Sequence, residues 1–468
     1  MSRVKRFAKT AGTFLVGNVL SKLVAIFLLP IYTVYLSPSE YGTYDLVISI
    51  LNLVTPIAFV QIWDGMYRFV FDCKNDAEKY DIVSNSLVVC FAGCLVFSAL
   101  YACVAIFAGN WVSLGIWAYG LTLSLQYEVS YIARSFFKNA LFSASGVVNA
   151  LVAALLNIVL ICHCGWGVES IYFSASIGNT VQVLVVVFAM RLPEYLRFSS
   201  IDRDLIFRMV KFSIPLCLAS LSFWLFNGFT KVIISIFLGT ADNGYYGVVS
   251  RFTAGVTMIA SVFQFAWNEA SYLMAGNQNR ISAFSLICNV LFAALSLVAV
   301  LFPYIVRFVF PYFVAPDYSS AVLLLPAATL GVMLNSYASF LATIFATEKM
   351  TRMVFLSVVG AAVVNVVFTP LATMEFGLSG SVWSLALSYG VLAIVRLAGL
   401  KKLVDVQVGM RTLLPLVSLP LAYGAFYFDD VAISVAVVSV CSLFCGVLGF
   451  KALKDNPGIN MEINDGAR

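Results

Sequence analysis

The stretch FLVGNVLSKLVAIFLLPIYTVYLSPSEYGTYDLVISILNLVTPI, residues 14–57, contains two long apolar runs separated by the short polar turn SPSEYG. A helix needs about 20 apolar residues to cross the ~30 Å hydrocarbon core of a bilayer. Each run reaches this length when it is extended to its natural limits, at residues 9–35 and 41–63. The pattern therefore predicts two membrane-spanning helices joined by a tight turn.

Similar apolar runs recur along the whole chain. Hydrophobic residues make up 61% of it and charged residues 11%, against about 25% charged residues in a typical soluble domain. The basic start and the uninterrupted first run favour a retained helix over a removed signal peptide. We expect an all-α polytopic membrane protein with about 14 transmembrane helices, or twelve if the last two runs do not both span. The predicted spans are 9–35, 41–63, 82–108, 111–134, 139–162, 168–190, 211–238, 244–270, 282–307, 319–346, 352–371, 378–399, 411–427 and 430–451.

The positive charges alternate between the two ends of these runs. Of the 28 Lys and Arg residues, all but Lys22, Lys231, Arg251 and Arg307 lie at the termini or at the ends reached after every second run. Lys and Arg are enriched in the cytoplasmic loops of membrane proteins. This asymmetry predicts a multi-pass protein of the cytoplasmic (inner) membrane with both termini in the cytoplasm.

A weak internal repeat divides the chain. At an offset of 202 residues, Leu36, Glu40, Gly42 and Tyr44 match Leu238, Asp242, Gly244 and Tyr246, after the first and the seventh predicted spans. Six spans per repeat return the chain to its starting side, so the two repeats are parallel. We predict an N-terminal six-helix lobe (1–190), an amphipathic cytoplasmic linker (191–210), a C-terminal six-helix lobe (211–400), two additional transmembrane helices (401–454) and a cytoplasmic tail (455–468).

Some cations fall where a membrane disfavours charge. An uncompensated cation at the bilayer centre costs at least about 2.5–3.5 kcal/mol. Lys22 lies near the middle of the first span, and Lys231 and Arg251 lie on or beside polar stripes of the seventh and eighth spans. These stripes predict a water-filled cationic cavity. Alternatively, Lys231 extends to the outer surface, Arg251 pairs with Asp242 or caps its helix, and the further candidate Arg68 only determines topology.

Acidic residues also occur within or at the ends of predicted spans. They are either counter-ions for the cations or coupling residues that carry protons, and the absence of an evident carboxylate pair favours counter-ions. The four candidates are Asp45, Asp64, Glu128 and Glu269.

Signatures of catalysis are missing. The chain has one histidine, no phosphate-binding glycine-rich loop and no long outer loop that would hold an active centre. Cys162, His163 and Cys164 lack a clear fourth ligand for a metal. The charges cap helices and form no basic soluble face for nucleic acid. We expect neither an enzyme nor a metal or cofactor site.

Residues 14–57, followed by DGMYRFVFD (64–72), resemble the polysaccharide transporter branch of the multidrug/oligosaccharidyl-lipid/polysaccharide exporter superfamily, which includes the Wzx-type flippases. TKVIISIFLGTADNGYYGVVSRFTAG (230–255) is similar to the seventh and eighth helices of the same family. One departure is that Thr230, rather than an acidic residue, precedes the cation of the seventh helix. The resemblance covers essentially the whole chain.

The resemblance implies a flippase that moves a polyprenyl-diphosphate-linked oligosaccharide to the outer leaflet by alternating access, for O-antigen, capsule or exopolysaccharide (lipopolysaccharide) synthesis. Lys22, Lys231 and Arg251 would bind the diphosphate, and the last two helices would offer a groove for the lipid tail. A polysaccharide polymerase, chain-length proteins and membrane lipids are the implied partners. Polar and aromatic partners for the sugars would be Asn18, Asn52, Asn227, Gln264, Trp224 and Trp267.

Three other functions compete with this interpretation. A cation-coupled multidrug exporter of the same superfamily would favour a buried carboxylate in the first lobe, whereas the first span carries Lys22. A membrane polysaccharide polymerase or ligase is disfavoured by the short outer loops. A membrane scaffold would not require polar stripes.

Overall fold

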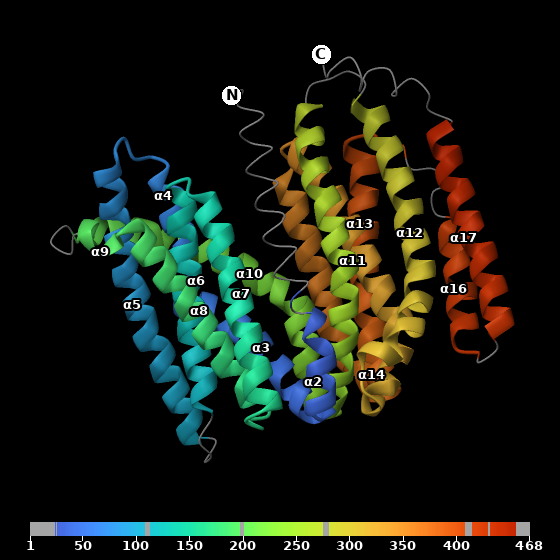
Figure 1. Ribbon diagram of the computed structural model, residues 1–468. Helices are drawn as coiled ribbons and strands as arrows, with labels where there is room; N and C mark the ends of the chain where they lie inside the picture. Colours follow the sequence, from blue (N-terminus) through green and yellow to red (C-terminus); the bar gives the residue numbers. More distant parts are fainter. Residues whose placement is uncertain are drawn as a thin grey trace. The chain divides into compact units, whose positions relative to one another are not determined.

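A computed structural model describes residues 24, 26–107, 113–196, 201–274, 280–407, 414–428 and 431–454. Within these residues the fold is helical and contains no strand (Figure 1). The elements are α2 (Leu29–Tyr35), α3 (Pro38–Ala58), α4 (Ile62–Val70), α5 (Asp76–Phe107), α6 (Leu114–Ser135), α7 (Asn139–Cys162), α8 (Glu169–Met190), α9 (Leu192–Tyr195), α10 (Arg203–Phe237), α11 (Thr240–Leu273), α12 (Arg280–Phe313), the 3₁₀ helix η2 (Pro316–Leu324), α13 (Leu325–Thr347), α14 (Thr351–Leu403), α16 (Pro415–Phe426) and α17 (Val431–Lys454).

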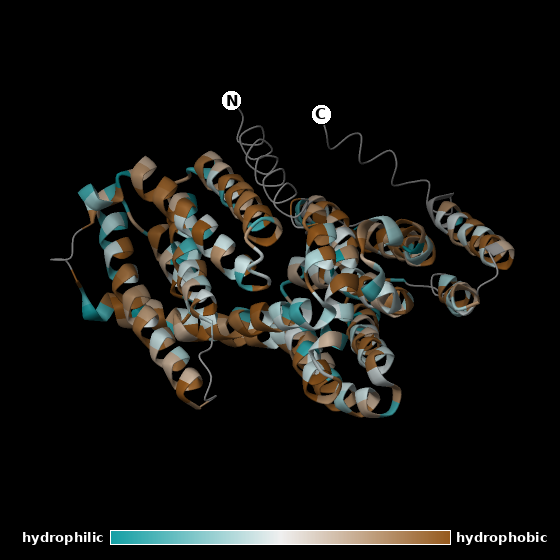
Figure 2. Ribbon diagram, turned by 60° about the horizontal axis from the view of Figure 1, so that its bottom comes forward, coloured by the Kyte–Doolittle hydropathy of each residue, from teal (hydrophilic) through white to brown (hydrophobic). Residues whose placement is uncertain are grey.

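The expected all-α polytopic fold is confirmed. Nine of the described helices are long and apolar enough to cross a membrane, and the bent pair α3–α4 makes a tenth candidate. Figure 2 shows apolar residues along most of the length of these helices. The number fourteen is not established, because the first predicted span lies mostly outside the described residues and α16 has only 12 residues.

Two predicted spans, 352–371 and 378–399, are joined within α14. This element has 53 residues and is interrupted at Gly377, whose φ of 60° and ψ of −145° are not helical. Such a backbone conformation is accessible to glycine because it has no Cβ. The interruption divides α14 into two arms that correspond to the two predicted spans.

The turn SPSEYG forms a capping box at the start of α3. The Ser37 side chain accepts a hydrogen bond from the Glu40 backbone N–H at 3.3 Å, and the Glu40 carboxylate accepts one from the Ser37 N–H at 2.9 Å. Pro38 occupies the first turn, where its missing N–H costs nothing. At the matching position of the internal repeat, Gly239 provides no side-chain cap for α11.

The chain forms two compact units, residues Met1–Lys231 (unit 1) and Val232–Arg468 (unit 2). The boundary between these two compact units falls inside α10, and the predicted lobes and linker stay predictions. Within unit 1, α10 packs closely on α4. A Cβ added at Gly65 of α4 would lie 2.5 Å from Ser213 Oγ and 3.0 Å from the Met209 carbonyl oxygen of α10.

Each unit has its own buried interior. In unit 1 the fully buried Phe59, Ile62 and Met66 pack with Val83 of α5 and Ile132 of α6. In unit 2, α13 is the central helix and packs against α11, α12 and α14 (Figure 1). Most of the apolar stretch that α13 shares with η2 is buried, so α13 has little surface left for lipid.

Candidate functional site

A buried ion pair joins two helices of unit 1. Lys231 Nζ of α10 lies 2.8 Å from Asp45 Oδ2 of α3, with side chains that are 16% and 6% exposed, respectively. Lys231 was predicted as a cavity cation and Asp45 as a counter-ion. Removing one partner of such a pair leaves a buried charge and costs about 3–5 kcal/mol. Loss of either partner alone would therefore destabilise unit 1.

Further polar contacts connect α10 to the segment α3–α4. Trp224 Nε1 donates to the Ser49 carbonyl oxygen at 2.8 Å, and Ser220 Oγ donates to Gln61 Oε1 at 2.8 Å. Both Trp224 and Ser220 belong to the stretch of α10 that ends at Lys231. Asn227, on the same helix, has an exposed side chain.

A break separates α3 from α4. The two helices are bent by 53°, and the break contains Val60 and Gln61 with φ values of 53° and 46°. Positive φ is uncommon for residues other than glycine and strained for a β-branched side chain such as valine. Gln61 donates from its backbone N–H to the Pro56 carbonyl oxygen at 2.8 Å, and from Nε2 to Asp64 Oδ2 at 2.5 Å. Its side chain thus connects α10 to the Asp64 carboxylate.

Glu128 of α6 is completely buried. Ser86 Oγ of α5 donates to its Oε1 at 2.5 Å, whereas its Oε2 has no hydrogen-bond partner among the described residues. Within the described part of the chain, no Lys or Arg forms an ion pair with Glu128 or with Asp64.

Other predicted residues lie in unit 2. Gln264 Nε2 of α11 donates to Thr343 Oγ1 of α13 at 2.7 Å and to Asn268 Oδ1 at 2.8 Å. Trp267 Nε1 donates to the Phe340 carbonyl oxygen at 3.2 Å. These contacts attach α11 to α13. Arg251 is half-buried on α11, and Glu269 is exposed near the end of the same helix.

Arg68 and Asn52 are not enclosed. Arg68 lies in the last turn of α4 and pairs with Asp72 at 2.7 Å, with both side chains more than half exposed. Such exposed pairs contribute about 0–1 kcal/mol. Asn52 is an exposed residue of α3. Lys22 and Asn18 lie outside the described residues.

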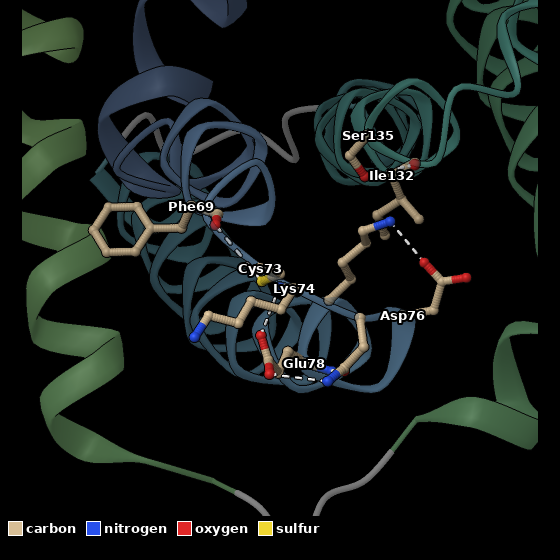
Figure 3. A network of polar contacts seen from close by, with 9 residues as sticks. Phe69, Cys73, Lys74, Asp76, Glu78, Ile132 and Ser135 are labelled. Carbon is tan, nitrogen blue, oxygen red and sulfur yellow. Dashed lines mark hydrogen bonds and ion pairs between the residues drawn. The ribbon is translucent and has the colours of Figure 1, made fainter.

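The connection that follows Arg68 is ordered by local capping (Figure 3). The Lys74 backbone N–H donates to the Glu78 carboxylate at 2.8 Å, and Lys79 pairs with Asp76 at 2.6 Å. Cys73 Sγ donates to the Phe69 carbonyl oxygen at 3.7 Å. These contacts are all local to the connection between α4 and α5, so its predicted role in topology stays a prediction.

Arg396 was predicted only as a charge that determines topology, yet it is 5% exposed. Its Nε donates to Ser357 Oγ at 3.0 Å and its NH1 donates to the Ala338 carbonyl oxygen at 2.6 Å. No carboxylate among the described residues pairs with it. One signal was present in the sequence, because Arg396 lies inside the predicted span 378–399 rather than beyond its end.

An apolar groove opens in unit 2 between α12, α13, α14 and α16. Its volume is about 540 Å³, and its walls are formed by apolar and aromatic side chains. Two glycines, Gly390 and Gly424, keep parts of it open. The larger lining side chains include Leu334, Tyr337, Trp383, Ile394, Leu419 and Tyr423. Within the described residues no cluster of three or more His, Cys, Asp or Glu side chains could hold a metal ion.

The long apolar helices define a multi-pass membrane protein. The chain belongs to the polysaccharide biosynthesis protein family, whose sequence profile matches residues 7–272, more than half of the 468 residues. This membership and the structural similarities below support the polysaccharide transporter branch of the superfamily identified in the sequence. No curated protein matches the sequence.

Several solved structures share this fold. The lipid II flippase MurJ in an inward closed conformation superposes with a TM-score of 0.69 and 14% identity, over 94% of this chain and 99% of that one. An inward-facing multidrug resistance transporter of the MATE family gives a TM-score of 0.65 and 13% identity, over 82% and 95%. The Vibrio cholerae MATE transporter VcmN in its bent form gives 0.53 and 12%, over 85% and 96%.

Proposed function

We propose that this protein is a flippase that moves a polyprenyl-diphosphate-linked oligosaccharide across the cytoplasmic membrane by alternating access, for O-antigen, capsule or exopolysaccharide synthesis. The observation that carries the proposal is the buried Lys231–Asp45 pair in a member of a polysaccharide biosynthesis family. The protein moves its cargo without making or breaking bonds, and a polysaccharide polymerase with its chain-length proteins would take up the product.

In this proposal Lys231 exchanges one anion for another. A diphosphate oxygen replaces Asp45 Oδ2 next to the ammonium, so that the cation is never left buried without a partner. A charge-assisted hydrogen bond of this kind contributes about 1.5–3 kcal/mol. Lys22 and Arg251 are the further cations that we assign to the cargo. We also propose that the chain has two six-helix lobes and that both of its termini lie in the cytoplasm.

The lipid tail would lie in the apolar groove of unit 2. The groove has room for part of an isoprenoid chain, because its volume of about 540 Å³ is lined by side chains such as Leu419 and Tyr423. Burying each CH₂ group of a tail contributes about 0.8 kcal/mol. The ion pair of unit 1 suits an anionic head group, and the groove of unit 2 suits an apolar tail.

A cation-coupled multidrug exporter is the second candidate. Two observations favour it, namely the fold shared with MATE transporters and the buried carboxylate of Glu128 in unit 1. Such a protein would take compact amphipathic cations and would gain nothing from a lysine in its cargo site.

Complementation distinguishes the two candidates. A strain that lacks its repeat-unit flippase should recover surface polysaccharide when this protein is produced, and Lys231→Ala should remove that recovery when polysaccharide is compared per molecule of folded protein. Lys79→Ala serves as the matched control, because Lys79 also pairs with an aspartate but lies in the first turn of α5, where that aspartate is exposed. Recovery with Lys231→Ala equal to that of the unmodified protein would contradict the role of the cation, and drug resistance without polysaccharide would favour the exporter.

A further inference from the structure

The guanidinium of Arg396 is buried in unit 2, and no carboxylate among the described residues pairs with it. It lies where α13 meets the two arms of α14. Its Nε donates to Ser357 Oγ of the first arm at 3.0 Å, and its NH1 group donates to the Ala338 carbonyl oxygen of α13 at 2.6 Å. Both acceptors are neutral, so they leave the positive charge uncompensated.

This guanidinium still has hydrogen-bond donors to offer. An arginine side chain carries five N–H groups in a planar fork, and the two hydrogen bonds use two of them. The Ser357 hydroxyl donates its own proton to the Val354 carbonyl oxygen at 2.8 Å, so its oxygen is free to accept from Nε. Ser357 and Ala338 therefore fix the orientation of the fork, and its other N–H groups make no hydrogen bond within the described part of the chain.

The acidic residues that follow α13 and α14 are engaged elsewhere. Glu348, directly after α13, pairs with Arg280 of α12 at 2.8 Å. Asp405, two residues after α14, is exposed and accepts a hydrogen bond from Gln407 Nε2 at 3.1 Å. A buried ion without a partner is strongly destabilising. The negative charge of a bound ligand would remove this cost.

The depth of Arg396 suits a ligand at the membrane surface. The 53 residues of α14 are divided at Gly377 into two arms of about 39 Å each, at 1.5 Å per residue. Each arm is about 9 Å longer than the hydrocarbon core. Arg396 lies seven residues before the end of its arm, so its Cα is only about 5 Å inside the hydrocarbon boundary. Arginine side chains at such depths reach lipid head groups by snorkelling and local thinning of the bilayer.

Exposed cations lie at the same end of unit 2. Arg352 is in the first turn of α14, and Lys401 and Lys402 are in its last turn. The contact between Arg396 and Ser357 brings these two ends of α14 together. The charge pattern predicts that this end is cytoplasmic, and basic residues there attract the anionic lipids of the cytoplasmic leaflet.

We propose that Arg396 binds a phosphate oxyanion, supplied by the head group of an anionic lipid of the cytoplasmic leaflet. The planar fork presents N–H groups that match the oxygen atoms of a phosphate. The bound phosphate neutralises the buried charge and holds α13 to both arms of α14. This site requires neither Lys231 nor the apolar groove, so it stands apart from the proposed function.

Thermal unfolding of the purified full-length protein in dodecyl maltoside micelles tests the site. We expect phosphatidylglycerol to raise the unfolding midpoint by several degrees, and digalactosyldiacylglycerol, which has no phosphate, to leave it unchanged. Arg396→Gln should raise the concentration of phosphatidylglycerol needed for this effect about ten- to a hundredfold, because a charge-assisted hydrogen bond is lost. Arg352→Gln is the matched control, since it removes the same charge from an exposed position of α14. Equal responses of the two variants would overturn the proposal.

Salts separate the lipid from free phosphate. Sodium phosphate, sodium chloride and sodium gluconate are compared without lipid, at constant pH and ionic strength. A rise that depends on Arg396 with inorganic phosphate, but none with phosphatidylglycerol, would assign the site to free phosphate and contradict the lipid. A rise with chloride as large as that with phosphate would show an unselective anion site and overturn the phosphate assignment.

A second variant keeps the test decisive if Arg396→Gln does not fold. Arg396→Lys retains the positive charge but lacks the planar fork, so it should fold and respond severalfold more weakly to phosphatidylglycerol. A response equal to that of the unmodified protein would overturn the role of the guanidinium. Because no cargo takes part in these measurements, a failure of the proposed function would leave their outcome unchanged.

Discussion

The two units bury different kinds of polar group. Among the described residues, the buried carboxylates Asp45 and Glu128 both lie in unit 1, where Lys231 joins Asp45. Unit 2 instead buries a neutral network between the arms of α14, in which Thr369 Oγ1 donates to Asn365 Oδ1 at 2.9 Å and lies 3.1 Å from Ser384 Oγ. Buried ionised groups respond to protons and anions, whereas neutral networks respond mainly to packing. Unit 2 also buries the Arg396 guanidinium, against a hydroxyl and a carbonyl oxygen. The difference between the units, among the described residues, is therefore that the buried carboxylates belong to unit 1.

Removal of the buried charges of unit 1 should have the largest effect, and two variants separate its causes. Lys231→Ala alone should lower both the amount of folded protein and the transport, because Asp45 is left buried without a partner. The double variant Lys231→Met/Asp45→Leu should recover folded protein, since an apolar replacement of a buried pair is often neutral or stabilising. Its transport should stay about ten- to a hundredfold below the unmodified protein.

Thermal unfolding and polysaccharide level are the two measurements for these variants. Recovery of transport in the double variant, together with its stability, would show that the pair has only a structural role in unit 1.

Filling the groove of unit 2 should have the next largest effect. No atom lies within 4 Å of a Cβ added at Gly424, so Gly424→Leu can place its side chain in the groove without a clash. We expect a severalfold loss of transport at unchanged thermal stability. Gly446→Leu on α17 is the control, because this glycine also has open space and does not line the groove. Equal transport by both variants would show that the groove does not hold the lipid tail.

Removal of a neutral hydroxyl should affect the stability of unit 2 and little else. Thr369→Val deletes the contacts to Asn365 and Ser384 and should cost about 1–3 kcal/mol, because it removes two buried hydrogen bonds. Thermal unfolding measures this loss, and transport per folded molecule should remain unchanged. A selective loss of transport would show that unit 2 also handles polar cargo or ions.

The exposed charges of unit 1 should have the smallest effect. Arg68→Gln breaks the pair with Asp72, which is worth about 0–1 kcal/mol, so stability and transport should both remain close to those of the unmodified protein. A large transport defect would instead show that Arg68 acts on the cargo, as a cavity residue would.

Cysteine labelling tests the topology at the same end of α4. Partial burial and nearby carboxylates raise the pKa of the Cys73 thiol, so its thiolate fraction at neutral pH is lower than that of a free cysteine. Cys164, between α7 and α8, is exposed. In single-cysteine variants, an impermeant maleimide should label Cys164 in intact cells, and Cys73 only after lysis and faster at higher pH. The reverse order would contradict the orientation.

Much of the fold could be predicted from the sequence because apolar length alone identifies spans. Residues 41–63 were predicted as one span, yet the structure breaks them at Val60 and Gln61. Pro56 lies inside α3, shortly before the break, but the left-handed conformation depends on tertiary contacts such as the one between Gln61 and Ser220. A count of local preferences does not include such contacts.

The site was predicted in part for the same reason. The spacing of polar residues along α10 identified Lys231, but no local pattern specifies that Asp45, far away in the sequence, is its partner. Arg396 was assigned to the membrane surface because its charge agrees with the alternation of Lys and Arg. Its burial follows from packing against Ala338 of α13, which the charge pattern does not contain.

Translocation of a lipid-linked oligosaccharide by the purified protein in liposomes tests the central claim most directly. We predict that the unmodified protein moves a polyprenyl-diphosphate-linked oligosaccharide between leaflets, and that Lys231→Met/Asp45→Leu, folded to the same extent, does not. Equal rates for the two proteins, or transport of cationic drugs without any movement of the lipid, would contradict the account.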